Sequence, residues 1–193
     1  KFIGVKYKNL DVIYHYSFYH QFHHNKSLSY TNFLNFVELN KTFNKNNEIL
    51  LVSGSKKRKE YEVLNILENL KSDLNKNIRF GVAFNPYFFE DKFYKIERNR
   101  LIAKLESCFV HSIWLQFGSE LNQLSREINF LNKILDNSQK LINKEIKIYG
   151  SLFIPSKQFI ARFKFRPWRG VYLSYKYLNS LEESGKITKN IID

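Results

Sequence analysis

Five runs of apolar, β-branched and aromatic residues constrain the fold more than any other feature of the sequence. They read DVIYHYS, EILLVSG, RFGVAFNPY, SIWLQFG and IKIYGSLFI, at residues 11–17, 48–54, 79–87, 112–118 and 146–154. Each run is nearly continuous rather than alternating with polar residues, and this is typical of strands that are covered on both faces. The sequence therefore predicts a β-sheet of at least five buried strands.

Segments with helical spacing lie between these strands, at 60–71, 97–108 and 120–135. In the second segment Leu101, Leu105 and Cys108 fall on one face, so Cys108 is expected to be a buried thiol. Strands that alternate with helices build right-handed βαβ units around a parallel sheet. The predicted fold class is therefore α/β.

Two α/β architectures fit this pattern. One is a complete doubly wound sheet of the flavodoxin kind, and the other is a (β/α)₈ TIM-barrel-like fold, as an incomplete barrel with about five to six βα units. The chain has 193 residues and no linker, repeat or shift in composition, so residues 1–193 are expected to form a single domain. In both architectures the functional residues collect at the carboxyl ends of the strands, where this chain places polar residues or glycines.

The charge of the chain raises the question of a nucleic-acid partner. The 31 Lys and Arg residues outnumber the 18 Asp and Glu residues and give a net charge of +13. The cations cluster only in KKRK (56–59) and RFKFRPWR (162–169), and a solvated basic face is favoured over nucleic-acid binding. The second cluster interleaves cations with aromatic residues, which suits base stacking, an aromatic-anchored loop or a lid over a phosphate tail.

The single cysteine excludes an internal disulfide and indicates a reducing compartment, so a cytoplasmic protein is expected. No apolar run approaches the ~20 residues that cross a bilayer, so no membrane association is predicted. The chain begins with Lys1 and contains no Met, so Lys1 is not expected to be the natural start. Missing residues at either end, and an oligomeric state, stay open.

Four histidines in HYSFYHQFHH fall within ten positions. His20 and His24 would share one face of a helix, but no cysteine or closely spaced carboxylate completes a set of four ligands. We therefore predict no metal site, and interpret His15, at the end of the first strand, as a ligand contact.

The stretch SGSKKRK (53–59) is neither a Walker loop nor a dinucleotide fingerprint. It predicts either a turn with solvated cations or a turn that lets a phosphate approach the backbone.

Four segments between about residues 11 and 155 resemble, in order and spacing, the methylenetetrahydrofolate reductase family, which are flavin-binding (β/α)₈ barrels. VIYHYS is similar to a strand that ends in His, an apolar residue and Ser or Thr, and ILLVSGS lies where the family has a strand that ends in Arg-Gly-Asp. FGVAFNPYFFED is similar to the segment that leads into a flavin-contacting loop. ERNRLIAKLES followed by IWLQFG is similar to a helix with an acid and a lysine before a strand that ends in Gln and an aromatic residue.

The resemblance implies a flavin-dependent oxidoreductase of one-carbon metabolism that transfers hydride from NAD(P)H to FAD and then to a folate-like small molecule. Carried over position by position, the implied substrate contact is Gln116, and the implied FAD contacts are His15, Gly54, Ser55, Ala83, Asn85, Glu97, Arg100 and Lys104.

The chain also departs from the family pattern. Ser53-Gly54-Ser55 replaces Arg-Gly-Asp, the expected loop histidine falls on Phe88 or Phe89, and no residue matches the general acid of the first barrel strand. Positioned proton transfer is worth ~10²–10⁴ in rate, so the folate chemistry is expected to be impaired and no catalytic residue is assigned. The alternative function is a non-catalytic binding or assembly subunit that contacts RNA or an acidic partner through its basic surface.

Overall fold

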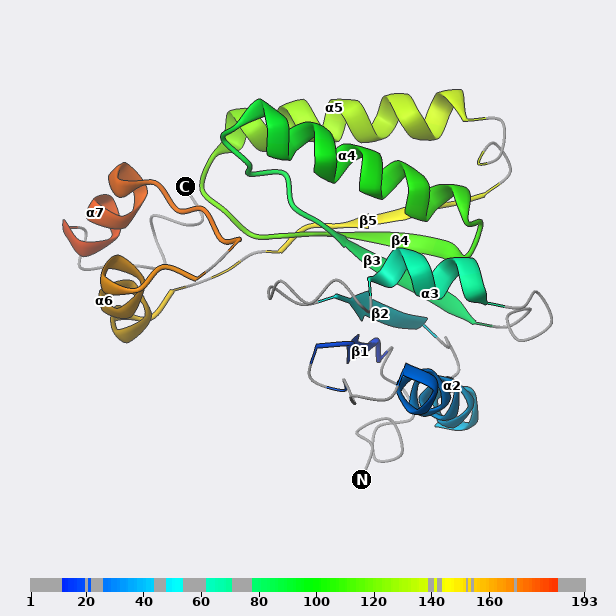
Figure 1. Cartoon of the computed structure of the whole chain (residues 1–193). Coiled ribbons are helices and arrows are strands. Elements are labelled where there is room, and N and C mark those ends of the chain that lie inside the picture. The colour runs from blue at the N-terminus through cyan, green and yellow to red at the C-terminus, as the bar shows by residue number, and fades with distance from the viewer. Residues whose placement is uncertain are drawn as a thin grey trace.

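The structure is a computed structural model that describes residues 12–19, 21, 26–43, 48–53, 62–70, 78–138, 141, 144–151, 153, 155–168 and 170–183. This part of the chain contains five strands and six helices (Figure 1). In chain order they are β1 (Tyr14–Ser17), α2 (Lys26–Phe43), β2 (Glu48–Val52), α3 (Val63–Asn69), β3 (Arg79–Phe84), α4 (Asp91–Glu106), β4 (Val110–Leu115), α5 (Leu121–Asn137), β5 (Lys147–Tyr149), α6 (Lys157–Phe165) and α7 (Tyr175–Glu183).

The five strands form one parallel sheet in the order β1-β2-β3-β4-β5. All five predicted strands are present, and both the α/β class and the parallel sheet are confirmed. Each strand pairs with the next along the chain, so the described sheet lacks the reversal of order at which a doubly wound sheet binds ligands. Closure into a barrel stays a prediction, as does a single domain over the whole chain.

One face of the sheet forms the main hydrophobic core. Alternate strand residues such as Leu51, Val82 and Ile113 point to this face and are almost fully buried. Helices α2, α3, α4 and α5 supply the other side of the core, through residues such as Phe33 and Leu101. Burying one large apolar side chain stabilises a fold by ~1.5–3 kcal/mol, so this layer holds the sheet and the helices together.

The opposite face of the sheet, called here the open face, is not covered by any of the described helices. The register places its side chains in two rows, His15, Leu50, Gly81, Ser112 and Lys147 in one and Ser17, Val52, Ala83, Trp114 and Tyr149 in the next. The second row lies nearer the carboxyl ends of the strands. In a closed barrel this face would be the interior.

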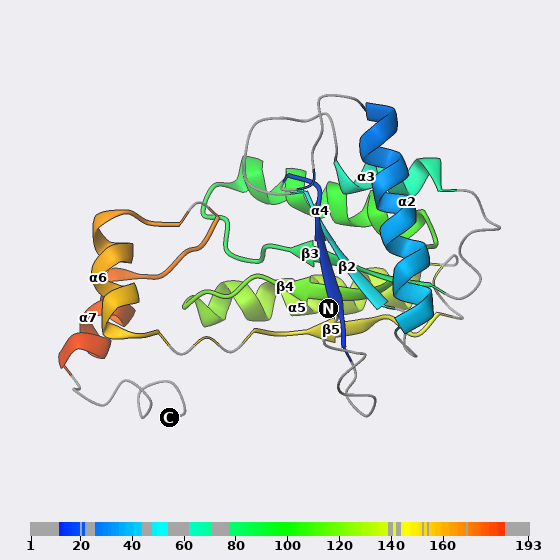
Figure 2. The same ribbon diagram turned by 90° about the horizontal axis from the view of Figure 1, so that it is seen from below.

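Helices α6 and α7 form a second, smaller cluster, which we call the C-terminal unit. It lies beyond the carboxyl ends of the strands and apart from the other helices (Figure 2). Ile160 and Phe163 of α6 pack against Leu178 and Leu181 of α7. The Oγ atom of Ser156 accepts a hydrogen bond from the backbone N–H of Phe159 at 3.1 Å and so caps the start of α6.

The expectation for Cys108 is wrong. Helix α4 ends at Glu106, and Cys108 follows it as an exposed residue with a φ of 63°. The left-handed conformation commonly ends a helix, because it redirects the chain after the last turn. The apolar stripe of α4 therefore stops at Leu105, which is buried.

Candidate functional site

Two aromatic side chains on the open face reach toward each other across the middle of the sheet. His15 lies on β1 and Trp114 on β4, with β2 and β3 between them. Three strand spacings of ~4.8 Å place the two backbones ~14 Å apart in a flat sheet. The ring centroids are only 6.2 Å apart, in an edge-to-face arrangement. The predicted contact residue His15 therefore lies beside an aromatic wall that sequence reasoning did not identify.

Buried polar contacts hold the indole of Trp114 in place. Its Nε1–H donates a hydrogen bond to the Oγ atom of Ser112 at 2.9 Å, and the Ser112 hydroxyl donates to the carboxylate of Glu48. Ser112 is fully buried and Glu48 is nearly so. On its other side Trp114 stacks on Tyr149, with centroids 4.4 Å apart and an angle of 27° between the rings. Trp114 is thus fixed on both sides.

Ala83 is, like His15, a predicted contact that is exposed to solvent. It lies on β3, the central strand of the five, yet its side chain is exposed. A central strand is normally covered on both faces in a parallel sheet. Its exposure therefore means that the open face in front of Ala83 is accessible, between Trp114 on one side and the half-buried Val52 on the other.

The predicted contacts on α4 face a different group of partners. Glu97 Oε1 accepts a hydrogen bond from the backbone N–H of Asn85 at 3.3 Å. Arg100 lies 3.6 Å from a carboxylate oxygen of Glu62 and 3.9 Å from one of Glu97. The Nζ atom of the buried Lys104 donates to the carbonyl oxygen of Ala83 at 3.4 Å. Two cations and two carboxylates therefore neutralise one another next to the end of β3.

Burial lowers the pKa of Lys104 below its ordinary value of 10.5, and Arg100 adds to this, whereas Glu97 and Glu62 oppose it. The folded protein therefore loses this proton at a lower pH than the unfolded chain does. The free energy of unfolding gains a contribution from Lys104 as the pH rises toward 10.5, because the burial of a charged ammonium group is relieved there.

We expect the substitution Lys104→Met to remove this contribution to the pH dependence. The variant should be as stable as the unmodified protein at neutral pH, or more stable by up to ~1 kcal/mol, because an apolar side chain of similar length replaces a buried charge. The difference in free energy of unfolding between the variant and the unmodified protein should shrink as the pH rises toward 10.5. Urea unfolding of both proteins across the alkaline range measures the difference. Parallel curves would contradict a lowered pKa at Lys104.

Asn85 and Gln116 have partners within the protein. The Nδ2 atom of Asn85 donates to the carbonyl oxygen of Gly170 at 2.8 Å, and its Oδ1 atom accepts from the N–H of Tyr87 at 3.1 Å. Asn85 therefore ties the end of β3 to the C-terminal unit. Gln116 Oε1 accepts from the N–H of Phe117 at 3.1 Å, which fixes the carboxamide at the end of β4.

The segment that leads into α7 lies over the ends of β3 and β4. Tyr172 forms a parallel bridge with Gly118, and the Oγ atom of Ser119 accepts from the N–H of Ser174 at 2.8 Å. Phe89 packs against Tyr172, with ring centroids 5.1 Å apart. The positions where a family histidine was expected, Phe88 and Phe89, thus hold an intramolecular aromatic contact.

Of the stretch that follows β2, Ser53 belongs to the described residues. Ser53 Oγ accepts a hydrogen bond from the N–H of Val63 at 3.1 Å, which satisfies a free backbone donor at the start of α3. Gly54 and Ser55, two of the predicted flavin contacts, lie outside the described residues, as do the cations of KKRK and the three further histidines His20, His23 and His24.

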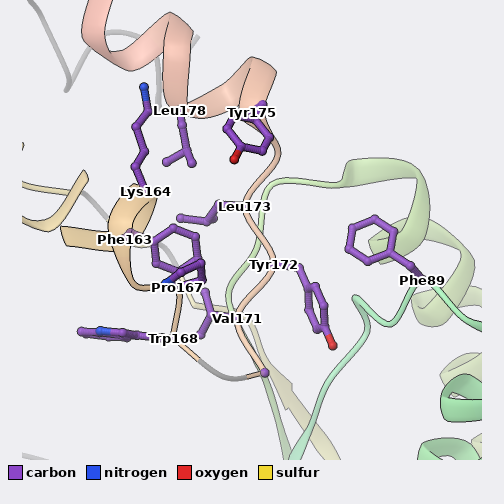
Figure 3. A pocket seen from close by; sticks show the side chains of 11 residues that line it. Phe89, Phe163, Lys164, Pro167, Trp168, Val171, Tyr172, Leu173, Tyr175 and Leu178 are labelled. Carbon is purple, nitrogen blue, oxygen red and sulfur yellow. The ribbon is translucent and has the colours of Figure 1, made fainter. Parts of the chain in front are cut away.

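A groove lies on the C-terminal unit, where it meets the loop before α4 (Figure 3). Its volume is about 530 Å³, which is within the ~300–1,000 Å³ typical of ligand sites. Its lining residues are Phe89, Phe163, Lys164, Pro167, Trp168, Gly170, Val171, Tyr172, Leu173, Tyr175 and Leu178. The interleaved cations and aromatics of 162–169 indicated this surface, but the sequence did not predict the two helices that shape it.

Comparison of the chain with models of known protein families gives no match, and a search of curated proteins finds no relative. Across the described ranges, no group of three or more His, Cys, Asp or Glu side chains is arranged to hold a metal ion. Among the helices in that same part of the chain, none combines the length and the apolar character needed to cross a lipid bilayer.

Proposed function

We propose that the chain is a barrel-type α/β protein related to methylenetetrahydrofolate reductase, and that it binds the flat ring system of a flavin on the open face. The observation that supports this most is the exposure of Ala83 on the central strand, beside the His15–Trp114 contact. Trp114 is held by Ser112 and Tyr149 and gives one wall of the surface, and its fixed orientation limits the entropy lost on binding a rigid ring.

The residues fit the ring system of FAD better than its diphosphate. Ala83, Val52 and Trp114 offer an apolar surface, with the imidazole of His15 close by for a polar ring edge. The cations expected near a diphosphate, Arg100 and Lys104, already contact carboxylates or a carbonyl. The proposal therefore assigns the ring to the open face and assigns no diphosphate site among the described residues.

The proposed activity is flavin binding with little folate chemistry. A bound flavin would supply hydride transfer. The role of the protein would be to orient the ring and to form hydrogen bonds with its edge. No residue matches the general acid of the family, and Ser53-Gly54-Ser55 supplies no carboxylate near the ring. With NAD(P)H and a folate as substrates, we therefore expect turnover well below that of an enzyme with a positioned acid.

Equilibrium dialysis with FAD tests the proposal. Ala83→Leu places three more carbon atoms on the exposed centre of the open face, and should weaken FAD binding by about 10-fold or more, which is ~1.4 kcal/mol. Ala161→Leu is the matched control, because Ala161 is also exposed but lies on α6, away from the open face. The control should bind FAD like the unmodified protein.

Two results would overturn the proposal. One is a purified protein that is colourless and takes up no added FAD. The other is FAD binding that Ala83→Leu leaves unchanged, because the ring would then lie elsewhere on the protein.

A further inference from the structure

The C-terminal unit is positively charged over most of its length, before α7 ends in Glu182 and Glu183, and the flavin proposal does not use this charge. Residues 156–179 contain six cations and no Asp or Glu, and seven aromatic residues are interleaved with them. The cations are Lys157, Arg162, Lys164, Arg166, Arg169 and Lys176, and the aromatic residues are Phe159, Phe163, Phe165, Trp168, Tyr172, Tyr175 and Tyr177. The segment is therefore positive throughout, and it forms most of the groove.

Several of the aromatic side chains in and beside the groove face solvent. Trp168 is 54% exposed, Tyr175 76% and Phe165 92%. On the other wall Phe89 is 62% exposed and packs edge-on against Tyr172. Figure 3 shows these two rings on the side away from Trp168. Large apolar groups that stay in water on a folded surface indicate an interaction site.

The cations lie on the same elements as these rings. Arg162 is exposed on α6, Arg166 is exposed at its end, and Lys176 is exposed on α7. Lys164 lines the groove itself, with its Nζ atom 3.0 Å from Oδ1 of Asn179. Lys164 is thus the cation within the groove, and the other three lie on the helices that form it, so a ligand in the groove would meet aromatic rings on a positively charged surface.

We propose that this groove binds single-stranded RNA. Proteins that bind single strands with little sequence preference combine a positive groove for the phosphates with aromatic rings on which unpaired bases stack. A duplex would present its phosphates but would keep its bases paired and stacked on one another, whereas unpaired bases can stack on exposed rings. The exposed rings of Trp168 and Tyr175 therefore favour unpaired bases as the occupant.

The first test is fluorescence anisotropy with a labelled oligo-U strand. Trp168→Ala and Tyr175→Ala should each weaken binding by about 10-fold, since one base stack contributes ~1–3 kcal/mol. Both side chains are more than half exposed, so the variants should keep the fold, which circular dichroism checks. Ala83→Leu should leave RNA binding unchanged, so failure of the flavin proposal and failure of this one are distinguishable.

The second test neutralises charge. The triple variant Arg162→Gln, Arg166→Gln, Lys176→Gln should reduce the slope of log K against log salt by about 2, at ~0.7 for each phosphate contact of a single strand. The matched control neutralises Lys92, Lys95 and Lys133, which are exposed on α4 and α5. Both triple variants lower the net charge equally, so only a local site predicts a larger loss for the first.

Intrinsic fluorescence gives an independent readout, because the chain has only two tryptophans. In a Trp114→Phe background Trp168 is the sole indole, and oligo-U should quench it saturably. The proposal is overturned if the unmodified protein does not bind oligo-U at low salt, or if both triple variants lose the same affinity. Equal affinity for a duplex of the same length, or equally effective displacement by polyglutamate, would also overturn it, because either would mean attraction by charge alone.

Discussion

Glu127→Ala should lower the free energy of unfolding by about 3 kcal/mol, because it leaves the charge of Arg98 without its partner between two packed helices. Glu127 is 1% exposed and lies on α5. Arg98 of α4 donates to both of its carboxylate oxygens, at 2.9 and 2.6 Å, and the hydroxyl of Tyr94 donates to one of them.

The expected loss of about 3 kcal/mol is at the lower end of the range for a buried ion pair that loses one partner. The reason is that the side chain of Arg98 is 29% exposed and can regain some hydration. The contacts also connect α4 to α5, so the loss extends beyond one ion pair. Arg98 further lies over the rings of Tyr94 and Phe130, at 4.5 and 4.3 Å from their centroids. Burial and the hydrogen bond to Glu127 raise the pKa of Tyr94, so its hydroxyl stays a donor at neutral pH.

Urea unfolding at pH 7 measures this effect, with Glu38→Ala as the control. Glu38 forms a comparable contact with Lys41, at 2.6 Å, but its side chain is 54% exposed. An exposed pair within one helix is worth ~0.3–0.5 kcal/mol, so the control should change stability little. Equal losses in the two variants would show that Glu127 is not buried as the structure places it.

Gly81→Val should lower the free energy of unfolding by about 2 kcal/mol and should also displace Trp114. A Cβ atom at Gly81 would lie 2.7 Å from Oγ of Ser112 and 2.8 Å from Nε1 of Trp114. Ser112 is fully buried and hydrogen-bonded to Glu48, so it has little room to move. The indole must therefore swing away, which breaks its hydrogen bond to Ser112 and its contact with His15.

Gly150→Val is the matched control, because no atom beyond the two adjacent residues lies within 4 Å of a Cβ atom built on Gly150. Thermal unfolding gives the stability of both variants, and tryptophan emission in a Trp168→Phe background gives the surroundings of Trp114. We expect a red shift for the Gly81 variant alone, because a displaced indole meets more water. Unchanged emission together with full stability would mean that Trp114 does not lie over β3.

The sheet could be predicted from the sequence because each of its strands carries a continuous apolar run. Three of the helices were recognised for a similar reason, since α5 has a long stripe from Leu121 to Leu135 and α3 and α4 have shorter ones, although only the second half of α4 was predicted. Helix α2 was missed because Asn and Thr alternate with Phe and Leu along 26–43 and leave no clear polar face. For α6, the capping residue Ser156 was a usable signal that the aromatic cluster at 162–169 obscured.

The strand ends were predicted as candidate positions, but their partners were not. The side chain of Asn85 donates a hydrogen bond to Gly170, which lies 85 positions away. Arg100 forms an ion pair with Glu62, the residue before α3. No local pattern encodes such contacts, because they depend on how distant segments pack. Trp114 was missed as a wall of the open face for the same reason: its position becomes clear only when the register places it beside Ala83 and its ring lies against that of His15.

The most direct test of the account is a titration of FAD into the Trp168→Phe protein, in which Trp114 is the only tryptophan. If a flavin ring binds on the open face, it lies against this indole and should quench its fluorescence saturably, and Ala83→Leu in the same background should raise the FAD concentration at half-saturation by about 10-fold or more. We expect half-saturation below ~1 mM, which corresponds to a binding free energy of about −4 kcal/mol. Fluorescence that does not change with FAD, after correction for absorbed light, would contradict it.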